Sequence, residues 1–352
     1  MIFLFSLIAF TTTALANDTA SMGTASNVSF VANKNVVIHR EDLTIGPMRH
    51  DNGAHVPIVV KYSMENMSSV PDPVQMAFPI PGCHFEKFFK AMIDSRVSAA
   101  DSCVKMPEMK VKVDGKIESS GKWIRRFLMR GVLFDESEFS KRTGVKSADL
   151  SNLLDSIPEL SDEKQEQAEK KFEDTVKRLC KKLGGTSKGY LGHECDPMKK
   201  LWAENVFVWS HEFRPKKKTE IVHEYQVEAS WNVDWRDRFD HDVFCLKDPS
   251  VLKAWEKNAE ISAPFIHHNF VGYILKTGGN WAKPIEEFNL TLRKKDKEQL
   301  VSTCFNGLKK MGPLEFKATR KNFLPTEDLY VLFFYANNLG RWKGDQWVPS
   351  KE

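Results

Sequence analysis

The sequence predicts a mainly β protein, a sandwich or paired antiparallel sheets, with a helical insertion that makes the fold α+β overall. Three observations predict this class. Segments with alternating apolar and polar residues occur in both halves of the chain, a Lys- and Glu-rich helical pattern separates them, and 41% of the 352 residues are hydrophobic, enough for a large core. The predicted parts are a leader (1–16), an N-terminal β-rich part (17–134), the helical insertion (135–200), a C-terminal β-rich part (201–340) and a tail (341–352).

The N-terminal β-rich part contains the clearest alternation. Strands are predicted at 35–45 and 56–65, then at 76–81 and 109–113, because these segments are rich in β-branched and aromatic residues and are bounded by turn residues. In the second strand one set of side chains is apolar: Ile58, Val60, Tyr62 and Met64. This pattern indicates a sheet with one covered face.

The helical insertion is predicted from residues at three- and four-residue spacing. Ser161 can cap a helix whose apolar positions include Ala168, Phe172 and Val176, and Gly184 can end it. The remaining residues are mostly charged, which is typical of a solvated helix surface.

The C-terminal β-rich part is predicted to begin with a long hairpin. Residues 207–213 and 221–231 each place apolar side chains on one face, and Pro215 and three lysines lie between them. On these faces His211 and His223 could meet as a core pair. Gly278-Gly279 is interpreted as a second hairpin turn, between strands at 271–275 and 288–292, and further strands are expected at 314–319 and 329–335.

The first 16 residues are predicted to be a cleaved signal peptide. Residues 2–10 form an uncharged apolar run that is too short to span a membrane, and Ala14-Leu15-Ala16 matches the small-x-small pattern of a cleavage site. Cleavage after Ala16 would give a periplasmic or secreted protein, and no later segment is long enough to span a membrane as an apolar helix.

Export favours disulfides among the six cysteines. Six cysteines allow 15 connectivities, and pairing of sequence neighbours is the simplest hypothesis. It would join Cys83 to Cys103, Cys180 to Cys195 and Cys245 to Cys304. Buried free thiols remain the alternative.

Charge and motifs exclude some functions and leave others open. A net charge of +4 over the whole chain is too small to indicate nucleic-acid binding, and no Walker or Rossmann glycine pattern occurs. No catalytic residue, cofactor or metal site is predicted. The best candidate cluster is Asp234, Asp237, Asp240, His241 and Asp242, whose oxygens and imidazole could bind a metal, although local ion pairs with neighbouring arginines are the stronger interpretation.

Two tryptophans near predicted turns, Trp235 and Trp281, are candidate recognition residues, because exposed indoles stack on sugars and peptides. Adjacent His267 and His268 would point to opposite faces of a strand, which argues against a shared metal.

Several stretches resemble one bacterial family, the domain of unknown function 4424. They are Asn17–Ala20 through Ile45, FPIP at 78–81, Trp209 and Phe213 with VHEY at 222–225, YILKTGGNW at 273–281, Cys304, and FLPTEDL at 323–329. The region 84–200 matches poorly. The resemblance implies an exported β-rich protein without an established activity and provides no catalytic residue. It also supports the pairing of Cys245 with Cys304.

The leading hypothesis is therefore a non-catalytic exported module that binds an envelope protein or polymer through loop and aromatic surfaces. One alternative is an envelope-polymer hydrolase that uses Asp237, Asp240 or His241. Another is a carrier of a small ligand or metal.

Overall fold

The described strands form three main sheets and a small one near the C-terminal end. The computed structural model describes residues 19–22, 29–30, 32–49, 55–79, 83–84, 108–129, 132–135, 201–228, 230–235, 245–246, 265–335, 341–343 and 346–348, with the single positions 141, 163, 167, 170 and 174. The mainly β class is confirmed.

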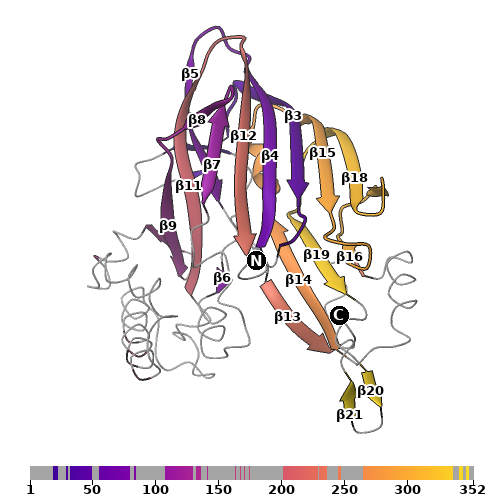
Figure 1. Cartoon of the computed structure of the whole chain (residues 1–352). Helices are drawn as coiled ribbons and strands as arrows, with labels where there is room; N and C mark the ends of the chain where they lie inside the picture. The colour runs from indigo at the N-terminus through magenta and orange to yellow at the C-terminus, as the bar shows by residue number, and fades with distance from the viewer. Residues whose placement is uncertain are drawn as a thin grey trace, which may run out of the picture.

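The largest sheet has eight strands and forms the centre of Figure 1. Its order is β17 (Lys309–Lys310), β18 (Glu315–Phe323), β15 (Ile285–Arg293), β3 (Val36–Ile45), β4 (His55–Asn66), β12 (Lys218–Glu228), β7 (Met109–Val113) and β8 (Lys116–Glu118). Neighbouring strands are antiparallel except β3 and β15, which pair in parallel. The parallel pair joins the two sequence halves within one sheet.

Two further sheets complete the main body. A seven-stranded sheet has the order β10 (Val132–Asp135), β9 (Lys122–Met129), β11 (Leu201–Phe213), β5 (Asp72–Pro79), β1 (Thr19–Met22) and β2 (Ser29–Phe30), with β6 (Cys83–His84) paired to β11. A four-stranded sheet has the order β13 (Ser230–Trp235), β14 (Phe265–Tyr273), β19 (Leu329–Tyr335) and β16 (Leu300–Ser302). In the predicted tail, β20 (Arg341–Lys343) pairs with β21 (Gln346–Val348).

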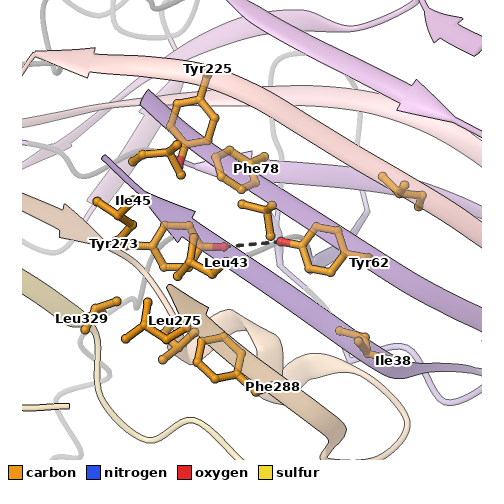
Figure 2. Close-up of a cluster of buried hydrophobic side chains, with 14 of the residues drawn as sticks. Ile38, Leu43, Ile45, Tyr62, Phe78, Tyr225, Tyr273, Leu275, Phe288 and Leu329 are labelled. Atoms are coloured by element: carbon orange, nitrogen blue, oxygen red, sulfur yellow. Dashed lines mark hydrogen bonds between the residues drawn. The ribbon is translucent and has the colours of Figure 1, made fainter. Parts of the chain in front are cut away.

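The predicted alternation in β4 is confirmed. Ile58, Val60, Tyr62 and Met64 are all buried, whereas the residues between them are partly or fully exposed. Their face packs into one continuous apolar core that also contains side chains of the other two sheets. Phe78 of β5 lies at the junction of the three sheets, because its ring contacts Tyr225 of β12 and Tyr273 of β14, as Figure 2 shows.

The predicted long hairpin is wrong in its pairing. β11 pairs with β5 and β9 in the seven-stranded sheet, while β12 pairs with β4 and β7 in the eight-stranded sheet. The short connection at 214–217 therefore crosses from one sheet to the other. The apolar face that the sequence shows on each strand fits this arrangement as well as it fits a hairpin. In both cases these faces are buried, and here the faces of β11 and β12 pack into the core from two different sheets.

Asn66, at the end of β4, ties this crossing to the connection between β4 and β5. Its side-chain amide donates to the carbonyl oxygens of Val70, at 2.8 Å, and Phe213, at 2.9 Å. The backbone carbonyl of Asn66 accepts a hydrogen bond from the backbone N–H of Lys216 at 2.8 Å. The fully buried Asn66 thus links the two connections that run between the eight-stranded and seven-stranded sheets.

The predicted hairpin turn at Gly278-Gly279 is also wrong. Lys276–Asn280 form a short 3-10 helix, η3, that connects β14 of the four-stranded sheet to β15 of the eight-stranded sheet. Glycines next to a polar residue are common in both kinds of connection, so the local sequence did not distinguish them.

No continuous helix among the described residues supports the helical insertion. Their continuous elements are strands and η3; the single positions 141, 163, 167, 170 and 174 are in helical conformation, and the rest of 136–200 lies outside the described part of the chain. Within the described part, no helix is long and apolar enough to cross a membrane.

Candidate functional site

A cavity of about 480 Å³ lies beside η3 and is the strongest candidate site among the described residues. It is lined by 275–276, 303–306, Arg320, Phe323 and 326–330. These segments come from both the eight-stranded and the four-stranded sheet and from the loops between them. The volume lies within the range of about 300–1,000 Å³ that is typical of small-ligand pockets.

A disulfide forms part of the cavity wall. Cys245 and Cys304 are bonded, with their Cα atoms 5.0 Å apart, and Cys304 belongs to the lining. The pairing that was predicted for these two cysteines is therefore confirmed. The bond connects the loop that follows β16 to a segment 59 residues earlier in the chain.

An aromatic cluster forms the apolar part of the cavity. Phe305 packs against Phe288 of β15 with 5.6 Å between ring centroids, and against Phe323 of β18 at 6.0 Å. Phe288 is fully buried, whereas the other two rings are half-buried and reach the cavity. Phe288 of β15 and Phe323 of β18 thus belong to one aromatic cluster, which extends from the core to the surface of the cavity.

Arg320 of β18 is the principal cation of the cavity. Its guanidinium lies 5.3 Å from the centroid of the Phe305 ring, and Nη2 donates to the carbonyl oxygen of Asn306. Gly307, with φ of +79°, follows this carbonyl, and a Cβ there would lie 2.8 Å from Nη1 of Arg320. Glycine therefore permits both the left-handed backbone and the close approach of the guanidinium.

Asp328 fixes the part of the lining that includes 275–276. Its Oδ1 accepts hydrogen bonds from the backbone N–H groups of Leu275, at 3.1 Å, and Lys276, at 3.3 Å, and Lys276 Nζ lies 3.8 Å from its Oδ2. Burial raises the pKa of Asp328, against the opposing effect of these hydrogen bonds and of Lys276. The pKa of Tyr330 is also raised, first by burial and then by the negative charge of Asp328.

The cavity thus combines aromatic rings, an arginine and a carboxylate with backbone partners. Such a lining can hold an apolar group and orient a charged one. The sequence analysis named none of these side chains as site residues. The only signal was indirect: YILKTGGNW, Cys304 and FLPTEDL, three of the stretches that resemble the 4424 family, all contribute to the lining.

Most of the predicted site residues lie outside the described residues. These are Asp237, Asp240, His241 and Asp242; Asp234 and Trp235 end β13, but their side chains are not described. Their role as a binding cluster stays a prediction. Among the described residues, no group of three His, Cys, Asp or Glu side chains is placed to hold a metal ion.

Trp281 is not an exposed recognition residue. It is 5% exposed and belongs to the core cluster, because the chain after η3 turns back beside β3, where the N–H of Ala282 donates to the carbonyl of Val36. The candidate partners Cys83, Cys103, Cys180 and Cys195 have no described side chains, so their pairing is untested.

The two histidines of the predicted pair occupy different environments. His223 is fully buried among Tyr62, Phe78 and Trp209, whose ring centroids lie 5.2–6.0 Å away. Burial lowers its pKa to about 3, so the ring is neutral at physiological pH. His211 is half-buried and packs on Phe213. His223 is thus a core residue, as the sequence favoured, but its neighbour from β11 is Trp209.

A buried polar contact lies near the centre of the core. The hydroxyl oxygens of Tyr62 and Tyr273 are 3.4 Å apart, and the Tyr273 hydroxyl donates to Oε1 of the fully buried Glu41 at 3.4 Å. Figure 2 shows the two hydroxyls directed at each other across the cluster. None of these three residues lines the cavity beside η3, and their contacts connect β3, β4 and β14 within the core.

Comparison with known families identifies the chain. The family described as Domain of unknown function (DUF4424) matches residues 16–332. The chain belongs to this family. The match extends across the region 84–200, where the motif resemblance was weak, and it includes every residue that lines the cavity. No curated protein matches the DUF4424 chain in sequence.

Two solved structures show a distant likeness. A candidate nutrient-binding protein from Legionella pneumophila has 12% identity and a TM-score of 0.44, with 91% of this chain and 72% of that chain covered. An M1 zinc metallopeptidase from Deinococcus radiodurans has 8% identity and a TM-score of 0.31, with 86% and 43% covered. This chain therefore spans less than half of the metallopeptidase, and at these scores neither likeness supports an argument about activity.

Proposed function

We propose that this DUF4424 protein is an exported, non-catalytic binding module whose ligand occupies the cavity beside η3. The observation that supports it most directly is the cavity itself, about 480 Å³ in volume, with aromatic rings and charged groups in its lining. Mixed linings of this kind bind small molecules or the end of a larger chain.

Export is supported by two independent features. The apolar leader ends in Ala14-Leu15-Ala16, and the family match begins at residue 16. The disulfide between Cys245 and Cys304 would persist in an oxidising compartment, such as a bacterial periplasm, and would be rare in a reducing cytosol.

Binding without catalysis is supported by how the cavity's groups are used. Asp328 is occupied by two backbone N–H groups, and Arg320 is held by an aromatic ring and a backbone carbonyl. A general acid or base needs a free proton position directed at the substrate. These groups are instead arranged to keep a fixed shape, which suits recognition.

A fragment screen with a cavity-blocking variant tests the proposal. Small-molecule fragments are screened by ligand-observed NMR against the mature protein, then against Thr326→Trp, which places an indole at an exposed position of the cavity lining. The matched control is Ser69→Trp, an exposed position on the connection between β4 and β5. We expect fragments of cavity size to lose at least tenfold in affinity in the first variant and to bind the second unchanged. If all the fragments that bind do so equally in Thr326→Trp, the cavity is not the binding site.

A further inference from the structure

We propose that the cavity recognises an anion, and that Arg320 binds a carboxylate whose ligand also has an apolar or aromatic group. This inference rests on the proposed function, because it names the ligand class of the same cavity. It is carried by the placement of Arg320 and by the groups around it.

Arg320 differs from other arginines of the eight-stranded sheet in its partners. Arg40 pairs with Asp42 at 2.9 Å, and Arg293 pairs with Glu315 at 3.1 Å. Among the described residues, no carboxylate lies within ion-pair distance of Arg320, although two acidic residues line the same cavity. A half-buried guanidinium without a counter-ion is a site that a ligand carboxylate can complete.

The guanidinium is also held in place before any ligand arrives. Stacking on Phe305 and donation to the carbonyl of Asn306 fix its plane, while Nη1, Nε and the second N–H of Nη2 remain as donors that none of the described contacts uses. An arginine side chain loses about 2 kcal/mol of rotamer entropy when it is immobilised. Here most of that loss precedes binding, which favours affinity for a planar, bidentate anion.

Lys276 is a weaker candidate for the same role. Its ammonium lies 3.8 Å from Oδ2 of Asp328, which already provides a negative charge. Phe305, Phe323 and Leu329 also line the cavity and offer apolar contacts. A ligand with its carboxylate on Arg320 and its apolar part on these rings uses both halves of the lining.

The charge of the chain segment that contains Arg320 favours an anion over longer distances. Residues 293–321 contain nine basic and three acidic side chains, a net charge of +6, whereas the whole chain has a net charge of +4. The rest of the chain is therefore slightly acidic. This segment contributes Arg320 and residues 303–306 to the cavity, and a net positive charge there attracts anions and raises their rate of association.

Matched ligands and matched variants test the inference. The ligands are 3-phenylpropionate and its neutral amide, measured by isothermal calorimetry with the mature protein at two salt concentrations. The variants are Arg320→Gln, which removes the charge, Arg320→Lys, which keeps it without the planar fork, and Arg40→Gln on the outer face as a control. We expect the carboxylate to bind at least tenfold more tightly than the amide, and this preference to fall to within threefold in Arg320→Gln. Arg320→Lys should keep part of the preference, and Arg40→Gln all of it.

The outcomes separate this inference from the proposed function. Equal binding of the two ligands, abolished by Thr326→Trp, would leave the cavity as a binding site and overturn the anion assignment. A preference for the carboxylate that survives in Arg320→Gln would assign the anion to another residue and also overturn the inference. Absence of carboxylate binding at millimolar concentration would overturn it as well, while neutral fragments that bind the cavity would still support the proposed function.

Discussion

His223 and Arg320 are both basic and both contact aromatic rings, but they differ in burial and in charge. His223 is enclosed by Tyr62, Phe78 and Trp209, is fully buried, and has its pKa lowered to about 3. Arg320 lies over the ring of Phe305 and is half-buried in the wall of a cavity. The rings around His223 exclude water and keep the imidazole neutral. The guanidinium of Arg320 contacts a ring on one side, and its charge is tolerated because the cavity leaves it partly exposed.

This difference separates the stabilising part of the fold from the part available for binding. Burial removes a charge where the group can lose its proton, and histidine can. Arginine keeps its proton in proteins, so a buried position without a counter-ion would be costly. The core around His223 should therefore determine stability, and the cavity around Arg320 should contribute little to it.

The largest expected effect is in the aromatic core. Phe78→Ala removes the ring that contacts His223, Tyr225 and Tyr273 at the junction of the three sheets. A buried Phe→Ala change costs about 3–5 kcal/mol because it combines lost transfer free energy with a cavity. Urea denaturation followed by tryptophan fluorescence would measure it. Val70→Ala is the control, since Val70 is 60% exposed and its truncation should cost under about 0.5 kcal/mol. A loss below 1 kcal/mol for Phe78→Ala would contradict the central position of this ring.

A smaller effect should appear as a pH dependence of stability. The pKa of His223 is lower in the folded state, about 3, than its ordinary value of 6.5, so below pH 6.5 the unfolded chain binds the proton and the folded chain does not. This contribution to stability is complete above pH 6.5 and decreases as the pH falls towards 3, by about 2 kcal/mol at pH 5. The free energy of unfolding, measured between pH 7.5 and 5, should lose this slope in His223→Phe. His55→Gln, on the neighbouring strand β4, should keep it. An unchanged slope in His223→Phe would show that other groups cause it.

The core could be predicted from the sequence more fully than the pairing of its strands. Alternation in β4 identified the buried face correctly, because a period of two depends only on which face is covered. It gave no information on the partner strand. β11 and β12 are consecutive and have suitable faces, but β11 lies in one sheet and β12 in another. The contacts that favour a connection between two sheets over a hairpin come from residues that are distant in sequence. One of them is the side-chain amide of Asn66, which donates to the carbonyl of Phe213, 147 residues away.

The candidate site could not be predicted for a related reason. Arg320 is one of many basic residues in its region, and nothing in the local sequence separates it from Lys317 or Lys321, which have carboxylate partners. Its role depends on Phe305 and Asn306, which a disulfide-bonded loop brings beneath it. The cavity therefore forms where segments that are distant in sequence come together. Residue spacing predicts structure within one segment, but it does not predict which distant segments meet.

The smallest expected effect on stability is at Arg320, and it is the sharpest test of the contrast with His223. Arg320→Gln removes a stacking contact and a hydrogen bond to Asn306, but it also removes a half-buried charge that has no acidic partner among the described residues. These contributions oppose each other, so the free energy of unfolding should change by less than about 1 kcal/mol. The same urea titration as for Phe78→Ala would measure it. A loss comparable to that of Phe78→Ala would mean that Arg320 stabilises the 303–308 loop as a structural residue. Reduced ligand binding in this variant would then reflect a collapsed cavity, and not a missing contact with the anion.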